Sequence, residues 1–317
     1  MQIKISEANA LGLQCDGWSN RRNESIINFI ITTPTPIFFK TFTTDTNRHT
    51  AEYMAEKIEE VLTEIGPEKF SALVTDNASA MVKARNNIHE KYKHISVYGC
   101  VAHTLNLLIG DISKMRTMAS IEDDVKSIVK EINNSHLLLA TFKKIQTEKK
   151  GTSVPISLKL SVKTRWGSIT HSLKSLLDTK YALKALAVCE TVDTILSKQV
   201  ERLVLDEAVF WVRVLKLFNL INPIVEYITK LESDKPKLSQ VVECFYSLEK
   251  HFQTVLPSSP LTKQEEQNLQ EFLVKRKRIV INPVHLAANI LDPRFNGVHL
   301  TNERFIMEVG KLKMKNN

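Results

Sequence analysis

Residues 11–19 read LGLQCDGWS, an alternation of apolar and polar side chains that runs into an acidic residue. Leu11, Leu13 and Cys15 recur at every second position, which is the period of a β-strand, and Gly17 follows the pattern. We therefore expect a strand that presents Asp16 at its end. We also expect the large aromatic side chain of Trp18 to pack in the core.

Two more strand patterns and a strand–helix alternation follow within the first hundred residues. The runs 26–32 and 37–43 are rich in β-branched and aromatic residues and are joined across prolines. Thr50 is a candidate cap for a helix that ends at Gly66, and a strand over 70–75 stops beside Asp76. A helix over 78–90 and a strand over 95–98 complete the series. This order predicts an α/β fold with a mixed five-stranded sheet within residues 10–100.

From about residue 101 the apolar period becomes helical. Apolar side chains share one helix face in three stretches: Ile121, Val125, Ile128 and Ile132, then Phe210, Val214, Leu217, Phe218 and Ile221, then Val241, Phe245, Leu248 and Phe252. Trp211 lies in the second stretch and is expected in the core. We predict two domains, residues 1–110 with the sheet and residues 111–317 almost entirely helical.

Charge divides the chain in the same way. The 317 residues carry a formal net charge of +8, to which residues 1–110 contribute −1 and residues 111–317 contribute +9. A basic part suits a phosphate-backbone partner such as DNA, and a solvated basic helical surface explains the same count. No apolar run approaches the roughly 20 residues that span a bilayer, so no membrane partner is expected. Four cysteines without a CxxC pair indicate a reduced, intracellular protein.

Asp16 and Asp76 follow strands that are neighbours in the expected sheet. Carboxylates that meet at one sheet edge supply the hard oxygen ligands that Mg²⁺ or Mn²⁺ prefers. Two such ions, about 3.5–4 Å apart, stabilise the attacking and leaving oxygens of phosphoryl transfer. We expect the carboxylates within about 4–7 Å of each other, with pKa values raised by repulsion. The simpler interpretation of an aspartate before glycine or asparagine is a turn or a cap.

Five short motifs occur in a fixed order along the chain. They are Cys15-Asp16-Gly17-Trp18-Ser19, Thr75-Asp76-Asn77-Ala78-Ser79-Ala80-Met81, Gly99-Cys100-Val101-Ala102-His103-Thr104-Leu105-Asn106-Leu107, Thr164-Arg165-Trp166-Gly167-Ser168 and Leu291-Asp292-Pro293-Arg294-Phe295. In order and spacing they resemble the hAT transposase superfamily, which includes domesticated relatives among the BED-zinc-finger proteins. The resemblance extends over residues 11–295.

The resemblance implies an RNase H-like core with a large all-helical insertion. Asp16 and Asp76 match the first two members of the family's Asp-Asp-Glu metal-binding triad, which would hold Mg²⁺ or Mn²⁺ in an active enzyme. Cys100 and His103 match its CxxH motif, which lies beside the active site and the DNA and is not a zinc site.

Trp166 matches an aromatic residue of the insertion that is associated with flanking DNA. The polar neighbours Lys163 and Arg165 favour an exposed position there, where an indole stacks on a base. The resemblance places the third carboxylate in a Ser-rich segment that ends in Glu-Arg, within a C-terminal dimerisation region. The sequence to Asn317 holds no such segment and no BED-type zinc finger. We therefore expect a chain truncated before the dimerisation region, and a homo-oligomer only of a longer product.

Simpler interpretations apply to two of these features. Cys100 and His103 would bind zinc only with two further ligands, and His103 alone suits a hydrogen-bonding position at a helix start. A nuclear localisation signal, a DNA-binding patch and a solvated helix face are the alternatives for the basic run of Lys275, Arg276, Lys277 and Arg278.

Three functions remain. The first is a nuclear, transposase-derived DNA-binding protein without strand cleavage, which is favoured because loss of one carboxylate leaves a second metal ion poorly held. The second is a fragment of an active hAT DNA transposase that uses the two-metal mechanism. The third is a protein-interaction module that has lost DNA binding.

Overall fold

The computed structural model describes residues 5, 7–19, 24–33, 35–43, 50–150, 154–162, 167–233 and 237–300. The chain forms two compact units, each assembled from separate segments. One unit combines Met1–Thr104, Ile228–Tyr246 and Lys275–Asn317, and the other combines Leu105–Tyr227 and Ser247–Val274. The sequence predicted one boundary between domains, at residue 110. In the structure the chain passes from one unit to the other several times.

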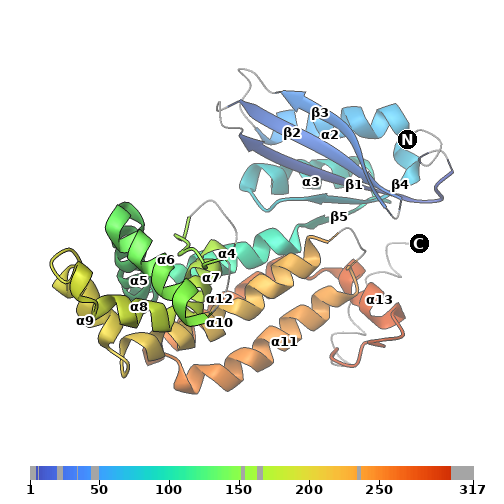
Figure 1. Cartoon of the computed structure of the whole chain (residues 1–317). Coiled ribbons are helices and arrows are strands. Elements are labelled where there is room, and N and C mark those ends of the chain that lie inside the picture. The colour runs from blue at the N-terminus through green and yellow to red at the C-terminus, as the bar shows by residue number, and fades with distance from the viewer. Residues whose placement is uncertain are drawn as a thin grey trace. The chain divides into compact units, whose positions relative to one another are not determined.

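The first unit contains a five-stranded mixed sheet, as predicted (Figure 1). β1 (Leu11–Ser19), β2 (Ser25–Thr32) and β3 (Pro36–Thr43) form an antiparallel meander. β4 (Phe70–Thr75) and β5 (Ser96–Gly99) add in parallel on the other side of β1. The resulting order β3-β2-β1-β4-β5 confirms the expected RNase H-like α/β arrangement.

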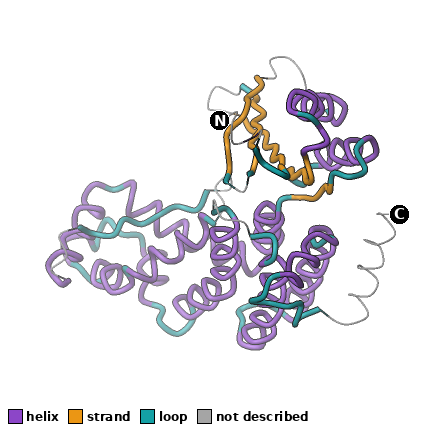
Figure 2. The backbone as a smooth tube through the Cα atoms, turned by 90° about the vertical axis from the view of Figure 1, so that its right-hand side faces the viewer, coloured by secondary structure: helices purple, strands orange, loops and turns teal. Residues whose placement is uncertain are grey.

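α2 (Ala51–Ile65) and α3 (Ser79–Lys91) cover one face of this sheet (Figure 2). The Thr50 hydroxyl accepts a hydrogen bond from the Tyr53 N–H at 3.2 Å, so the predicted cap of α2 is confirmed. Gly66 ends α2 with a φ of +109°, a conformation that favours glycine, and η1 (Pro67–Lys69) leads into β4. Alternate side chains of β1 and β2 pack against buried residues of both helices: Leu11, Leu13, Cys15, Ile27, Phe29, Ile31, Met54, Ile58, Val61, Leu62, Met81, Ala84 and Ile88.

Trp18 is not in this core, so that prediction was wrong. Its side chain is 45% exposed. Successive side chains of a strand point to opposite faces, and the odd positions of β1 face α2 and α3. The even position of Trp18 therefore places it on the other face, together with Asp16. Hydrophobicity alone predicted burial, but the strand period decides which face receives the side chain.

The rest of the described chain is helical, as the periodicity predicted. The elements are α4 (Val101–Ser113), α5 (Arg116–Asn134), α6 (His136–Lys150), α7 (Ser168–Asp178), α8 (Lys180–Ala187), η2 (Glu190–Val192), α9 (Lys198–Leu205), α10 (Phe210–Leu231), α11 (Gln240–Val255), η3 (Leu256–Ser258), α12 (Lys263–Val280) and α13 (Pro283–Leu291). Trp211 is buried, as expected, and its indole N–H donates to the Val204 carbonyl at 2.8 Å.

Within the described residues, no helix is by itself long and apolar enough to cross a membrane. α9 and α10 meet the length and composition of a span only when taken together, across a bend of 69°.

Candidate functional site

Three adjacent strands present the candidate residues at one register position. Cys15 of β1 lies opposite Thr75 of β4, which in turn lies opposite Gly99 of β5. The residue that follows each of these three belongs to the predicted site: Asp16, Asp76 and Cys100. Because neighbouring strands lie about 4.8 Å apart, the three residues start close together at one edge of the sheet. The carboxyl ends of parallel strands are where open α/β sheets bind ligands.

Asp16 and Asp76 reach this edge differently. β4 ends at Thr75, so Asp76 follows the strand, as predicted. β1 instead continues to Ser19, and Asp16 lies inside it, paired with Asn28 of β2. Asp16 is therefore fixed by strand pairing rather than by a turn. The turn interpretation fits Asp76 in part, because its Oδ1 accepts a hydrogen bond from the Ala78 N–H at 2.8 Å, at the start of α3.

Electrostatic interactions show which of these groups lie near one another. Desolvation raises the pKa of Asp16, and the charge of Asp76 raises it further. The charge of His103 and a hydrogen bond from the Gly17 N–H act in the opposite direction. Asp16 therefore lies close enough to Asp76 and His103 for both groups to act on its carboxylate.

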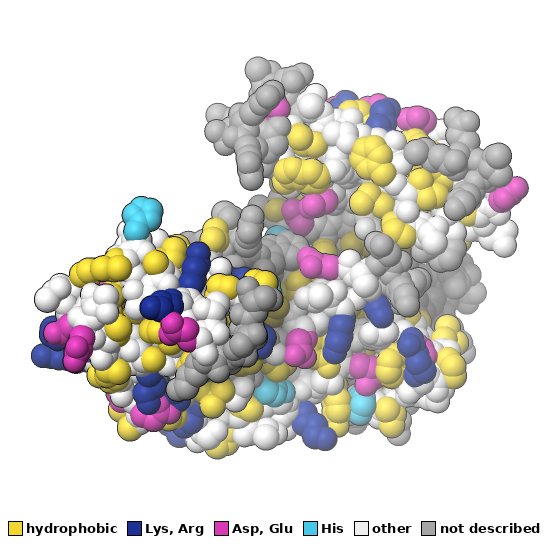
Figure 3. Space-filling model, viewed as in Figure 1, with side chains coloured by type: hydrophobic (Ala, Val, Ile, Leu, Met, Phe, Trp, Pro, Cys, Tyr) yellow, Lys and Arg dark blue, Asp and Glu magenta, His cyan; other side chains and the backbone are white. Residues whose placement is uncertain are grey.

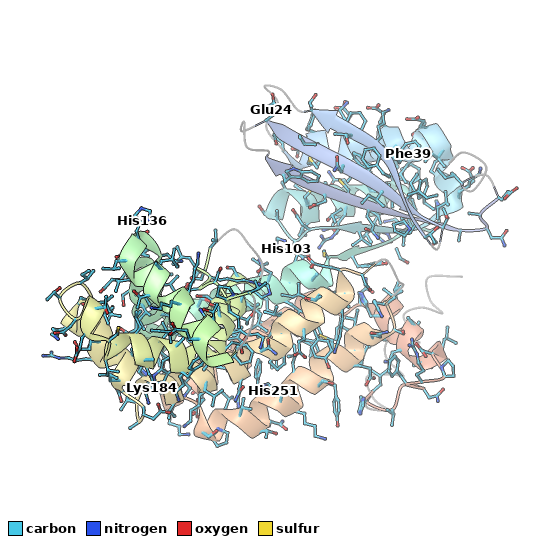
Figure 4. All side chains as sticks on the ribbon, viewed as in Figure 1. Glu24, Phe39, His103, His136, Lys184 and His251 are labelled. Atoms are coloured by element: carbon cyan, nitrogen blue, oxygen red, sulfur yellow. The ribbon has the colours of Figure 1, made fainter. Side chains whose placement is uncertain are left out.

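Cys100 caps α4. Its N–H donates to the Thr75 carbonyl at 2.7 Å, and its carbonyl accepts from the Thr104 N–H at 3.1 Å. Burial raises the pKa of the Cys100 thiol, and the charges of Asp16 and Glu232 raise it further, while the backbone N–H groups of Ala102 and His103 lower it. His103, labelled in Figure 4, lies in the first turn of α4, as expected for a residue at a helix start. The structure therefore brings Asp16, Asp76, Cys100 and His103 together.

A hydrogen-bond network behind this edge was not predicted. The buried Arg85 guanidinium of α3 donates to the Thr75 hydroxyl at 2.9 Å, to the Asp76 carbonyl at 2.6 Å and to the Asn77 Oδ1 at 3.0 Å. The Asn77 amide in turn donates to the Thr104 hydroxyl at 2.7 Å and to the Cys100 carbonyl at 3.2 Å. These bonds connect the end of β4 with the start of α4, so they fix the backbone that carries Asp76 and Cys100.

Gly99 has a packing reason at this position. A Cβ atom added to it would lie 1.8 Å from the Asn77 Oδ1. Any side chain at residue 99 would therefore displace the amide that links β4 to α4. The motif Gly99-Cys100 showed a glycine in the sequence, but its contact with Asn77 required the fold.

The predicted DNA-binding residues outside the sheet edge belong to two segments, 163–166 and 275–278. Lys163, Arg165 and Trp166 lie outside the described residues. Lys275, Arg276, Lys277 and Arg278 occupy the last turns of α12, where Lys275 and Arg278 are exposed and the other two half-buried. Cations at a helix C-terminus interact favourably with the helix dipole, so the run also has a structural explanation.

Within the described part of the chain, no group of three or more His, Cys, Asp and Glu side chains is arranged to hold a metal ion. Asp16 and Asp76 together offer carboxylate oxygens of the kind that Mg²⁺ and Mn²⁺ prefer, but they form an incomplete set of ligands. Glu232, just after α10, is an acidic residue that sequence reasoning missed. Its charge acts on the Cys100 thiol, and desolvation raises the pKa of Glu232 itself.

Two family models match the chain. Residues 5–128 match a domain of unknown function, DUF659, and residues 98–206 match the ZBED1 RNase-like helical domain. A search of curated proteins found no match. The two domains support a transposase-derived protein related to the ZBED and hAT groups, in agreement with the resemblance of the five sequence motifs.

Proposed function

We propose that this chain, a transposase-derived protein of ZBED and hAT type, binds double-stranded DNA and does not cleave it. The observation that carries the proposal is the placement of Asp16, Asp76 and Cys100 at one register position of an RNase H-like sheet. This edge suits a phosphate backbone when a divalent cation is bound to the carboxylates. Without the cation, the carboxylates would repel the phosphates.

Affinity for duplex DNA is expected to come mainly from the basic part of the chain. Residues 111–317 carry a net charge of +9, and Lys275 and Arg278 expose their charges at the end of α12. Each phosphate that such a side chain neutralises releases counterions, with a slope of about −0.9 in log K against log salt. Binding is therefore proposed to be weak, independent of sequence and steeply dependent on salt.

We propose that the chain does not cleave DNA because its described residues assemble too few carboxylate ligands for two metal ions. Asp16 and Asp76 would share one Mg²⁺ or Mn²⁺ ion, whose chemistry is to stabilise charge on phosphoryl oxygens. Two-metal cleavage needs a further carboxylate to hold the second ion, and the described residues assemble no such trio. Glu232 contributes charge near Cys100 without completing one.

The binding test measures fluorescence anisotropy of a labelled duplex over a range of salt concentrations. We expect Lys275→Ala/Arg278→Ala to flatten the salt slope by about 0.9 for each phosphate that the variant no longer neutralises. The matched control is Lys83→Ala/Lys93→Ala, which removes two exposed lysines from the near-neutral residues 1–110 and should leave the slope unchanged. Trp166→Ala should lower the affinity with little change of slope, because stacking releases few counterions. Equal effects of both double variants would contradict a role of the α12 run.

The cleavage test incubates the chain with supercoiled plasmid and Mg²⁺ or Mn²⁺. We expect no nicked product. Nicking by the chain that is lost in Asp76→Ala would overturn the proposal in favour of an active transposase. No binding of duplex DNA at low salt would instead favour a protein-interaction module.

We also propose a nuclear location, with the basic run of α12 as the signal. A fluorescent fusion should accumulate in the nucleus, and alanines at Lys275, Arg276, Lys277 and Arg278 should reduce that accumulation. An unchanged distribution would assign the run to DNA binding or to helix stability alone.

A further inference from the structure

The sheet has a second face that the helices α2 and α3 do not cover. On β1 to β3 this open face includes the side chains of Gln14, Asp16, Trp18, Ile26, Asn28, Ile30, Phe38 and Thr41. Hydrophobic side chains lie among polar ones over these strands (Figure 3). Trp18 and Phe38 are the large aromatic residues of the open face, and they are 45% and 54% exposed. Aromatic side chains are enriched where protein surfaces bind partners, and an exposed ring offers a flat face for stacking.

The same face is covered at its other end. Tyr98 of β5 lies on it, since Gln14 pairs with Val74 and Val74 pairs with Tyr98. The His285 ring of α13 packs edge-on against Tyr98, with ring centroids 5.0 Å apart, and the Asn282 amide donates to the Val97 carbonyl at 3.3 Å. α13 thus covers the β5 side of the face, whereas Trp18 and Phe38 stay exposed on β1 and β3.

Register fixes the distance between the two aromatic rings. Trp18 lies opposite Ile26, whereas Phe38 lies opposite Ile30, four residues further along β2 and on the far side of it from β1. Their backbones are therefore separated by about 10 Å across the strands and about 13 Å along them. This separation lets a different base stack on each ring, and it is too large for one ring system to contact both.

Polar groups occupy the space between the rings. Asn28 lies opposite both Asp16 and Thr41, and the Thr41 hydroxyl donates to the Asn28 Oδ1 at 2.6 Å. This hydrogen bond orients the Asn28 amide on the open face. Amide and hydroxyl groups between two exposed aromatic rings suit the edges of nucleobases, whose faces stack and whose edges donate and accept hydrogen bonds.

We propose that the open face of β1 to β3 binds unpaired nucleotides, with one base stacked on Trp18 and another on Phe38. The proposal rests on the proposed DNA binding and extends it to a class of substrate. The open face is continuous with the candidate site, because Asp16 belongs to both. A strand stacked on Trp18 and Phe38 crosses Asn28, which lies opposite Asp16, and thereby runs beside the edge that carries Asp76.

Stacking and charge neutralisation give separable signatures, which the test uses. The probe is a fluorescently labelled oligo(dT), titrated with the chain at several salt concentrations beside the labelled duplex. Trp18→Ala and Phe38→Ala should each weaken oligo(dT) binding about 5- to 150-fold, the effect of losing one stacked base, with the salt slope unchanged. Neither variant should alter duplex affinity. Leu291→Ala is the matched control, because it shortens an exposed apolar side chain of the same unit that is 81% exposed.

Conservative variants guard against a trivial loss of folding. Trp18→Phe and Phe38→Tyr keep a stacking ring and should retain oligo(dT) binding within a few-fold. Unchanged oligo(dT) affinity in both alanine variants, with duplex binding intact, would contradict nucleotide binding by the open face. It would not affect the proposed function. Loss of self-association in the alanine variants, measured by sedimentation, would assign the face to a second copy of the chain and also contradict nucleotide binding by the open face. No binding of either DNA would reject the proposed function itself.

Discussion

Arg85 supports the geometry of the candidate edge through several hydrogen bonds. Its side chain is buried, and its guanidinium donates to three acceptors in consecutive residues, 75 to 77. No sequence pattern predicted this role, because the contacts of Arg85 with residues 75 to 77 exist only once α3 packs beside the end of β4. That Asp16 and Asp76 belong to neighbouring strands was predictable, since each follows or lies in a recognisable strand within a characteristic motif.

Arg85→Met should destabilise the fold by about 2–3 kcal/mol, because it leaves buried acceptors without their charged donor. The free energy of unfolding from urea denaturation measures this. Lys83→Met is the control on the same helix. Lys83 makes an exposed ion pair with Glu52, so its loss should cost at most about 1 kcal/mol. Equal effects of the two substitutions would show that the network contributes little.

Ionisation of Asp16 should lower the free energy of unfolding. Desolvation and Asp76 raise its pKa, so the folded chain holds this proton more tightly than the unfolded chain does. The stabilising effect of the proton is complete below the unfolded pKa, near 3.9, and is lost as pH rises through the folded value. Asp16→Asn should therefore raise the urea midpoint at pH 7, in metal-free buffer, and the gain should vanish below about pH 4. A lower midpoint at pH 7 would contradict the repulsion.

At the scale of elements, one carboxylate joins two helix starts. Glu265 accepts hydrogen bonds from the N–H and hydroxyl of Thr117, at 2.9 and 2.7 Å, and from the same groups of Thr262, at 2.9 and 3.1 Å. Thr117 lies in the first turn of α5, and Thr262 directly precedes α12. The first N–H groups of a helix have no partner inside it. Glu265 therefore accepts from backbone N–H groups at the starts of both α5 and α12.

Glu265→Gln should destabilise the fold by about 1–3 kcal/mol, because an amide accepts through one oxygen and carries no charge. Burial alone would raise the pKa of Glu265, but the hydrogen bonds from Thr117 and Thr262 outweigh it and lower the pKa. A lowered folded pKa contributes stability above the unfolded value, near 4.3, that is lost as pH falls through the folded value. The deficit of the variant in urea melts should therefore shrink as the pH falls below about 4.3. Glu271→Gln on the same helix is the control and should stay within about 0.5 kcal/mol.

Elements were largely predictable because each follows from a local period. The five strands and the first two helices of the sheet unit lie within a few residues of the predicted bounds. The position of Trp18 was not predicted, because it depends on which face of the sheet the helices cover. That choice depends on contacts between distant segments, such as β1 with α2, and no period in residues 11–19 encodes it.

At the scale of the whole molecule, the sequence missed how the units are assembled. The segments Ile228–Tyr246 and Lys275–Asn317 belong with the sheet, although their helical period matches that of their neighbours. Lys275–Asn317 contacts the sheet through Tyr98 with His285 and through the Asn282 amide with the Val97 carbonyl. Ile228–Tyr246 in turn contacts that segment, because the Asn289 amide donates to the Ser239 carbonyl. Helical periodicity reports a buried face but not the partner that buries it, so a single change from strand to helix pattern predicted one boundary.

Metal and nucleic acid should bind this chain cooperatively if the candidate edge and the open face act together. Asp16 belongs to both, and an unneutralised carboxylate pair repels a nearby phosphate. At constant ionic strength, Mn²⁺ should therefore raise the affinity for oligo(dT), by about 5- to 150-fold for a typical coupling between sites. Linkage requires oligo(dT) to raise the Mn²⁺ affinity by the same factor.

Asp76→Asn separates this coupling from a general effect of divalent ions. Asp76 lies at the edge but not among the residues of the open face, so the variant keeps both stacking rings. It lacks one of the two repelling charges, so its oligo(dT) affinity in Na⁺ should be somewhat higher than that of the parent chain. The further increase in Mn²⁺ should be lost. Anisotropy titrations of both chains in both salts measure the difference. An equal increase in the variant would mean that Mn²⁺ acts on the DNA or elsewhere on the protein. The proposal that Asp16 and Asp76 hold a cation beside the bound strand would then be wrong.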